Sequence, residues 1–163
     1  MKAKPGRLLR WIFRMPLSLY RLGLGGFERL YGMRWILVTT SGRRTGNPHS
    51  VLLDVLSHDA GSDTYYVQPA YGRRADWVRN IEKNPLVDAQ VGRRRFRATA
   101  LAISGEEGAE RMMGFIHDHP VEWWMIGWML GIKPPPEAKS GEQLRRWLAQ
   151  EFLYVGIRPT AGA

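Results

Sequence analysis

Residues 35–48 have the sequence WILVTTSGRRTGNP, an apolar run followed by a polar turn. The apolar residues predict a β-strand over 35–40, and the turn, which Asn47 and Pro48 close, predicts a hairpin. Gly42 and Gly46 can adopt the positive φ values that let neighbouring backbone N–H groups point the same way. Such a turn, which also carries two arginines, suits a phosphate or a carboxylate, and an ordinary solvated hairpin is the alternative.

The positive charge of the chain is concentrated at its N-terminal end. The 163 residues carry a net charge of +9, and their composition is that of one globular domain. Residues 1–50 hold ten Lys and Arg against one acid, whereas the remainder is balanced with 14 of each. This asymmetry predicts an anionic partner for the N-terminal third.

Residues 1–34 are predicted to be a basic amphipathic helical segment that precedes a domain over 35–163. Apolar residues recur at three- and four-residue steps over 7–31, with arginines on the other side. One interpretation is a helix that caps the core. The other is a helix on an anionic membrane surface, with Trp11 and Phe13 at the interface. The expected location is cytoplasmic, or peripheral on the inner face of the plasma membrane in the second case, since no clean signal peptide is found.

The remaining pattern predicts an α+β fold around a small antiparallel barrel. Strands are expected over 35–40, 50–56, 64–68, 86–91, 94–103 and 152–157, and a short helix over 75–83. Ser104 with Glu107, and Ser140 with Gln143, form capping boxes that open two C-terminal helices. Pro120 starts the helix between them, whose residues 123–130 are expected to be mostly buried core, with an apolar ligand pocket as the alternative.

A second polar cluster, PAYGRRADWVRN at 69–80, lies where a strand ends and a helix begins. The helix N-terminus favours an anion, and Tyr71 and Trp77 offer flat surfaces for a ring system. A core role for Trp77 is slightly favoured over stacking. Two anion-binding turns with aromatic residues describe a site for a phosphorylated aromatic cofactor. Nucleic acid is disfavoured, because the arginines of 93–97 fit a solvated strand face.

Several other chemistries have no support in the sequence. The chain has no cysteine, and no Gly-x-Ser-x-Gly, Walker or Rossmann pattern. His117 and His119 have no partner at ligand spacing, so they are expected at a helix end and no metal site is predicted.

The block over 36–100 resembles the deazaflavin-dependent nitroreductase family of flavin and deazaflavin oxidoreductases. Its motifs are LVTTSGRRTGNP, YGRRADWVRNI and NPLVDAQVGRRRFRA. The resemblance implies a split β-barrel with N- and C-terminal helices that uses coenzyme F-420, an 8-hydroxy-5-deazaflavin. It also implies hydride transfer to a quinone, a nitro compound or a similar acceptor. The expected oligomeric state is a monomer or a homodimer. No catalytic side chain is assigned, because the cofactor carries the chemistry.

The resemblance also assigns the cofactor-binding residues. The family turn that holds the phosphate and acidic tail matches Arg43, Arg44, Thr45, Gly46, Asn47 and Pro48. The loop that borders the deazaflavin ring matches Pro69, Ala70, Tyr71 and Gly72, and the start of the helix beside it matches Trp77, Val78, Arg79 and Asn80.

Three features of the sequence depart from the family pattern. His49 stands where arginine usually follows the turn, Pro69 replaces a small polar residue, and the last helix lacks the tyrosines of nitro-activating members. Related barrels bind FMN or haem, so FMN is the less favoured cofactor. A non-catalytic barrel that binds a flavin, haem or lipid is the alternative function.

Overall fold

The computed structural model describes residues 34–138 and 141–160. The predicted helix over 7–31 and the capping residue Ser140 lie outside these ranges.

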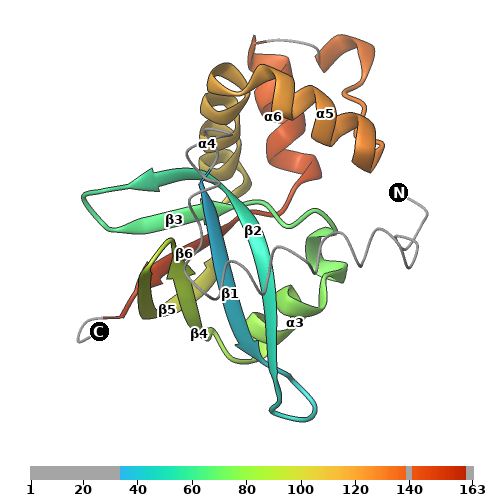
Figure 1. The fold of residues 1–163 in the computed structure, drawn as a ribbon. Helices are drawn as coiled ribbons and strands as arrows, with labels where there is room; N and C mark the ends of the chain where they lie inside the picture. Colours follow the sequence, from blue (N-terminus) through green and yellow to red (C-terminus); the bar gives the residue numbers. More distant parts are fainter. Residues whose placement is uncertain (1–33, 139–140, 161–163) are drawn as a thin grey trace.

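Six antiparallel strands close into a barrel (Figure 1). The strands are β1 (Trp35–Ser41), β2 (Pro48–Asp59), β3 (Thr64–Val67), β4 (Leu86–Val91), β5 (Arg94–Ala102) and β6 (Val155–Pro159). Their order is β1-β2-β3-β6-β5-β4, and β4 pairs with β1 to close the cylinder. The predicted α+β fold around an antiparallel barrel is confirmed.

The barrel interior follows from the alternation of side chains along each strand. Ile36 and Val38 of β1 are fully buried, and Phe96, Ala98 and Ala100 of β5 share one buried face. Arg95 and Arg97 alternate with Phe96 and Ala98 and are exposed, as predicted for a solvated strand face. Arg93 lies in the turn before β5, and Leu37, between Ile36 and Val38, is also buried.

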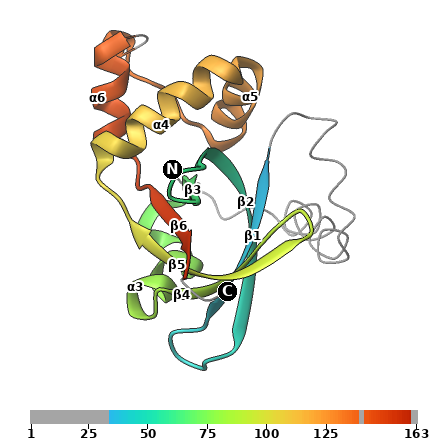
Figure 2. The ribbon, with the colours of Figure 1, turned by 90° about the vertical axis from the view of Figure 1, so that its left-hand side faces the viewer.

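The helices occupy two separate regions of the barrel surface (Figures 1 and 2). The helix α3 (Asp76–Lys83) packs beside β1 near the β1–β2 turn, and α4 (Gly105–Asp118), α5 (Pro120–Leu130) and α6 (Gly141–Glu151) gather at the other end. Short 3-10 turns lie at Gly72–Arg74 and Pro136–Ala138. The hydroxyl of Ser104 accepts a hydrogen bond from Glu107 N at 3.2 Å, and Pro120 is in the first turn of α5, as predicted.

Tertiary packing shifted two strands from their predicted positions. β2 is longer than 50–56, because pairing with β1 and β3 continues to its two ends, with a register shift between Val55 and Ser57. The last strand begins at Val155 and not at residue 152. Phe152 packs edge-on against Trp147, and Tyr154 donates a hydrogen bond to the carbonyl of Leu148, so Phe152 and Tyr154 belong to the helical cluster.

The prediction that residues 123–130 are mostly buried core is wrong. Trp123 packs against the cluster formed by α4 and α6, but Trp124, Met125 and Trp128 are 70%, 47% and 78% exposed. The physical reason is that, among the described residues, α5 packs against its neighbours through one face.

Candidate functional site

The two polar clusters of the sequence meet in the structure through Asn80. This side chain is 2% exposed and lies on α3. Its Oδ1 accepts hydrogen bonds from the backbone N and Nη1 of Arg43, at 3.1 and 3.3 Å. Its Nδ2 donates to Thr40 Oγ1 at 3.0 Å, so Asn80 joins the end of β1, the turn and the helix.

Arg43 is held in place from several sides. Its Nη1 forms an ion pair with Asp76 at 3.1 Å, and its carbonyl accepts a hydrogen bond from Lys83 Nζ at 2.8 Å. The guanidinium therefore fixes the turn on α3, with about a quarter of the side chain left exposed at 27%. Lys83 was missed in the sequence analysis, and only its place in the last helical turn could have drawn attention to it.

The backbone of the turn is largely closed on itself. Gly42 N donates to Asn47 O and Gly46 N donates to Gly42 O, both at 2.8 Å, while Asn47 N donates to Thr45 Oγ1 at 3.3 Å. Gly46 has the expected positive φ of 73°. The predicted open array of N–H groups is thus mostly satisfied within the protein, and the binding capacity of the turn resides chiefly in its side chains.

Arg44 is the exposed cation of the turn. Among the described residues, its side chain has no ion pair and no hydrogen bond. Thr45 and Pro48 are exposed beside it. Because Arg44 is not neutralised, it is the turn residue best able to bind an anion.

The loop over 69–75 leads into α3 with a fixed backbone. The carbonyl of Pro69 accepts hydrogen bonds from Gln68 Nε2 at 2.7 Å and from Gly72 N at 2.9 Å. Gly72 has φ of 51°, which favours glycine. Ala75 at the helix N-cap supplies no side-chain acceptor, so the first N–H groups of α3 have no side-chain cap.

The predicted residues of this second cluster divide into buried and exposed sets. Pro69, Trp77 and Val78 are buried, and both Trp77 and Val78 belong to the barrel core, which agrees with the favoured core role for Trp77. Tyr71 is 41% exposed and Arg79 is also exposed, with Ala70 half-buried. Only Tyr71 therefore presents an accessible ring.

The electrostatic character of the assembled region is positive. Residues 42–48 and 69–84 contain six basic side chains against two acidic ones. Both acids are engaged, Asp76 with Arg43 and Glu82 with Arg73 at 2.8 Å. The remaining positive charge and the uncapped helix start make this face suited to an anion.

The family departure at His49 lies directly beside the turn. A Cβ placed on Gly42 would lie 2.9 Å from His49 Nε2, so the imidazole packs closely against the turn backbone. Pro69 takes part in the hydrogen bonds of its loop through its carbonyl oxygen, which proline retains although it lacks a backbone N–H. In α6 the tyrosine-free segment supplies Leu144 and Leu148 to the helical core.

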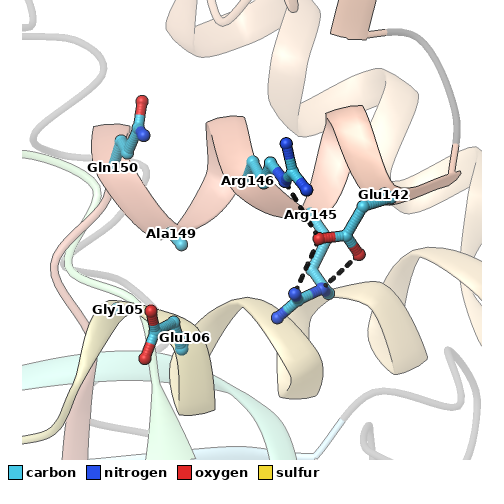
Figure 3. Close-up of a pocket in the computed structure, with 7 residues that line it drawn as sticks. All are labelled: Gly105, Glu106, Glu142, Arg145, Arg146, Ala149 and Gln150. Carbon is cyan, nitrogen blue, oxygen red and sulfur yellow. Dashed lines mark hydrogen bonds and ion pairs between the residues drawn. The ribbon is translucent and has the colours of Figure 1, made fainter.

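Two cavities lie away from this region. The first, about 370 Å³, is between α4 and α6 and contains Glu142, Arg145 and Arg146 (Figure 3). Both arginines bind Glu142, which lowers the pKa of that carboxyl to about 2, so the charges satisfy one another. The second, about 380 Å³, lies between β2 and α4 and also contains no predicted site residue.

Within the described residues, no group of three or more His, Asp or Glu side chains could hold a metal ion. His117 is in the last turn of α4 and His119 is its C-cap, as predicted. The arrangement is suited to an anionic ligand, and the described residues of this face offer no acid–base constellation.

The match to known families decides the class of this protein. A family model described as F-420H(2)-dependent quinone reductase matches residues 13–122, which is more than half of the chain. The chain belongs to this family. It is an oxidoreductase that uses the deazaflavin coenzyme F-420, as the resemblance implied. No curated protein matches the sequence.

Solved structures share the fold of this reductase. A Clostridium acetobutylicum protein related to general stress protein 26, of the pyridoxinephosphate oxidase family, has a TM-score of 0.50 at 12% identity and covers 86% of this chain and 84% of its own. An F-420-H2 dependent reductase (FDR-A) has a TM-score of 0.49 at 19% identity, covering 76% and 92%. The likeness to the first of these structures supports the barrel fold and nothing finer. None of the helices described in this structure has the length and apolar character needed to cross a bilayer.

Proposed function

We propose that the turn over 42–47 and the start of α3 hold the acidic tail of coenzyme F-420, while loop 69–72 borders its deazaflavin ring. The observation that carries this proposal is the attachment of the turn to α3 by Asn80, which brings the two polar clusters onto one positive face. Arg44 and Arg79, both exposed, are the cations that we assign to the tail.

The residues of this face have different tasks. Arg43 positions the turn through Asp76 and Asn80, and part of its guanidinium stays accessible. Tyr71 offers its ring to the deazaflavin. Trp77 and Val78 are buried in the barrel core and would support the loop that borders the ring.

When bound, the reduced cofactor supplies the hydride. The chain binds and orients the cofactor and shields the reacting ring from solvent. The family description names quinones as the acceptors. A quinone is therefore the proposed acceptor, with nitro compounds as a second class to be tested on the same preparation.

Fluorescence titration with coenzyme F-420 tests the binding site. We expect Arg44→Gln to weaken binding, and Arg43→Ala with Arg44→Ala to weaken it more strongly at low salt than at high salt, because salt screens exposed charges. Arg93→Gln is the matched control, since this exposed arginine lies in the β4–β5 turn. Equal dissociation constants for wild type and the double variant would remove these arginines from the site.

Turnover separates catalysis from simple binding. Reduced coenzyme F-420 and a soluble quinone such as menadione should give oxidation of the cofactor by wild-type protein. Tight binding without turnover, with either quinones or nitro compounds, would favour the non-catalytic flavin-, haem- or lipid-binding alternative.

We also propose that residues 1–31 contact an anionic membrane surface. Each basic residue close to such a surface contributes about 1 kcal/mol, and salt screens this attraction. Co-sedimentation with phosphatidylglycerol vesicles should therefore decrease as salt is raised. Binding that is equal for neutral and anionic vesicles would contradict this role.

The oligomeric state is measured separately, because sedimentation in vesicle-free buffer distinguishes a monomer from a homodimer.

A further inference from the structure

The helix α5 presents an unusual apolar surface to solvent. Among its described side chains, four large apolar ones are exposed, Val121 at 71%, Trp124 at 70%, Met125 at 47% and Trp128 at 78%. They occupy positions i, i+3, i+4 and i+7, which place them within an arc of about 100° on an α-helix. Large apolar side chains gathered on one face are typical of interaction surfaces.

The opposite face of α5 already has its packing partners. Trp123 packs against the core cluster of α4 and α6, and Gly127 is buried. Gly131 ends the helix in the left-handed conformation, at φ of 68°. The helix is thus fixed by one face and capped at its end, and its apolar stripe is held outward by that packing.

The stripe lies at the end of the barrel where the basic N-terminal segment joins. The carbonyl of Arg34 accepts a hydrogen bond from Val55 N at 2.9 Å, and its guanidinium lies 3.3 Å from His58 Nδ1. Leu56, between these two positions of β2, packs against the same helical cluster as Trp123. Residues 1–33, which precede Arg34, carry seven basic side chains and one acid.

The opposite end of β1 leads into the 42–47 turn and the proposed cofactor tail site (Figure 1). The two ends of β1 therefore lie in parts of the molecule with different side-chain chemistry. The helical end carries two exposed tryptophans and Arg34, the residue that follows the basic segment in the sequence, and the other end carries the turn proposed to bind the cofactor tail. Tryptophan is enriched where protein meets the headgroup layer of a bilayer, because its ring is apolar and its N–H is polar.

We propose that the face of Val121, Trp124, Met125 and Trp128 inserts into the interfacial layer of an anionic phospholipid membrane. The charge of residues 1–33 attracts the protein to the same surface, and the apolar stripe supplies the part of the binding that salt does not screen. This inference rests on the membrane contact proposed for residues 1–31, and it adds a second, structured surface to it.

The test uses the full chain and vesicles of phosphatidylcholine with phosphatidylglycerol, at low and high salt. We expect Trp124→Ser with Trp128→Ser to lower the vesicle partition coefficient about tenfold or more, most visibly at high salt, because each ring withdraws its apolar area from the bilayer. Leu86→Ser is the matched control, since Leu86 is 52% exposed on β4, at the α3 end of the barrel. The control should bind as wild type does.

The depth to which the tryptophans enter the bilayer is measured with brominated phosphatidylcholine, which quenches tryptophan fluorescence on contact. Trp124→Phe with Trp128→Phe should keep vesicle binding and lose part of the quenching seen for wild type. Retention of full quenching in this variant would place other tryptophans in the bilayer and overturn the proposal.

Two further outcomes would also overturn it. One is a serine double variant that binds vesicles at high salt as well as wild type does. The other is self-association of wild type that the serine variant abolishes while vesicle binding is unchanged, because the stripe would then be a contact between two copies. In the absence of vesicles, the same variants should bind coenzyme F-420 with the dissociation constant of wild type. If neither wild type nor any variant binds the cofactor, that result counts against the proposed cofactor site and not against the membrane face.

Discussion

Replacing Asn80 by Ala removes the side chain that joins the turn to α3. Three hydrogen bonds are lost, two from Arg43 and one to Thr40. Each net hydrogen bond contributes about 0.5–1.5 kcal/mol, and an unsatisfied buried donor costs about 1–3 kcal/mol. Arg43 N loses its acceptor in a partly buried position, so we expect a loss of about 3 kcal/mol in the free energy of unfolding.

Thermal and urea unfolding measure this loss. A change of 1 kcal/mol moves the midpoint by about 2–4 °C in a protein of this size, so Asn80→Ala should melt about 6–12 °C below wild type. Asn84→Ala is the control at the C-cap of the same helix, because Asn84 is exposed and accepts one hydrogen bond from Leu86 N at 3.1 Å. Its destabilisation should stay below about 1 kcal/mol.

A double-mutant cycle with Thr40→Val isolates the central bond. The coupling between the two sites should be about 0.5–1.5 kcal/mol, since Thr40 Oγ1 receives its hydrogen bond from Asn80. The same Asn80→Ala protein should bind coenzyme F-420 more weakly, because the turn is no longer fixed on α3. A melting temperature within about 2 °C of wild type, together with zero coupling, would refute the argument that Asn80 assembles the site.

Two other perturbations have sharp expectations. Arg94 and His58 lower the pKa of Asp63 to about 2 from 3.8, so the stability that these contacts provide is present above about pH 4 and is lost as the pH falls toward 2. Arg94→Gln should therefore flatten the fall of the urea midpoint between pH 5 and pH 2, and an unchanged slope would contradict this assignment. On α4, Gly108→Ala should destabilise by about 1–3 kcal/mol, because the new Cβ would overlap a buried tyrosine ring. Gly114→Ala should raise the free energy of unfolding by up to about 1 kcal/mol, since nothing lies within 4 Å of its added Cβ. Calorimetry of both variants would reject this reasoning if both were less stable, or both more stable, than wild type.

The local pattern of the chain predicted most elements and the class of the fold. Alternation along β1 and β5, the turn glycines and the Ser104 cap all reflect interactions between residues close in sequence. The motifs of the turn and of the 69–80 cluster also indicated an anionic cofactor, and family membership confirms that the protein uses coenzyme F-420. These features could be inferred because each depends on a local backbone or charge preference.

What the sequence determined by itself is the barrel, the basic N-terminal third and the residue types available for an anion. Only the tertiary structure decided how they are used. Asn80 became a buried link and Arg43 a positioning group because β1 packs against α3, which leaves Arg44 as the accessible cation of the turn. Likewise, the apolar pattern of α5 could not show which side faces the core, and packing against α4 and α6 left its tryptophan stripe in solvent, since one helix can bury only the face that its neighbours reach.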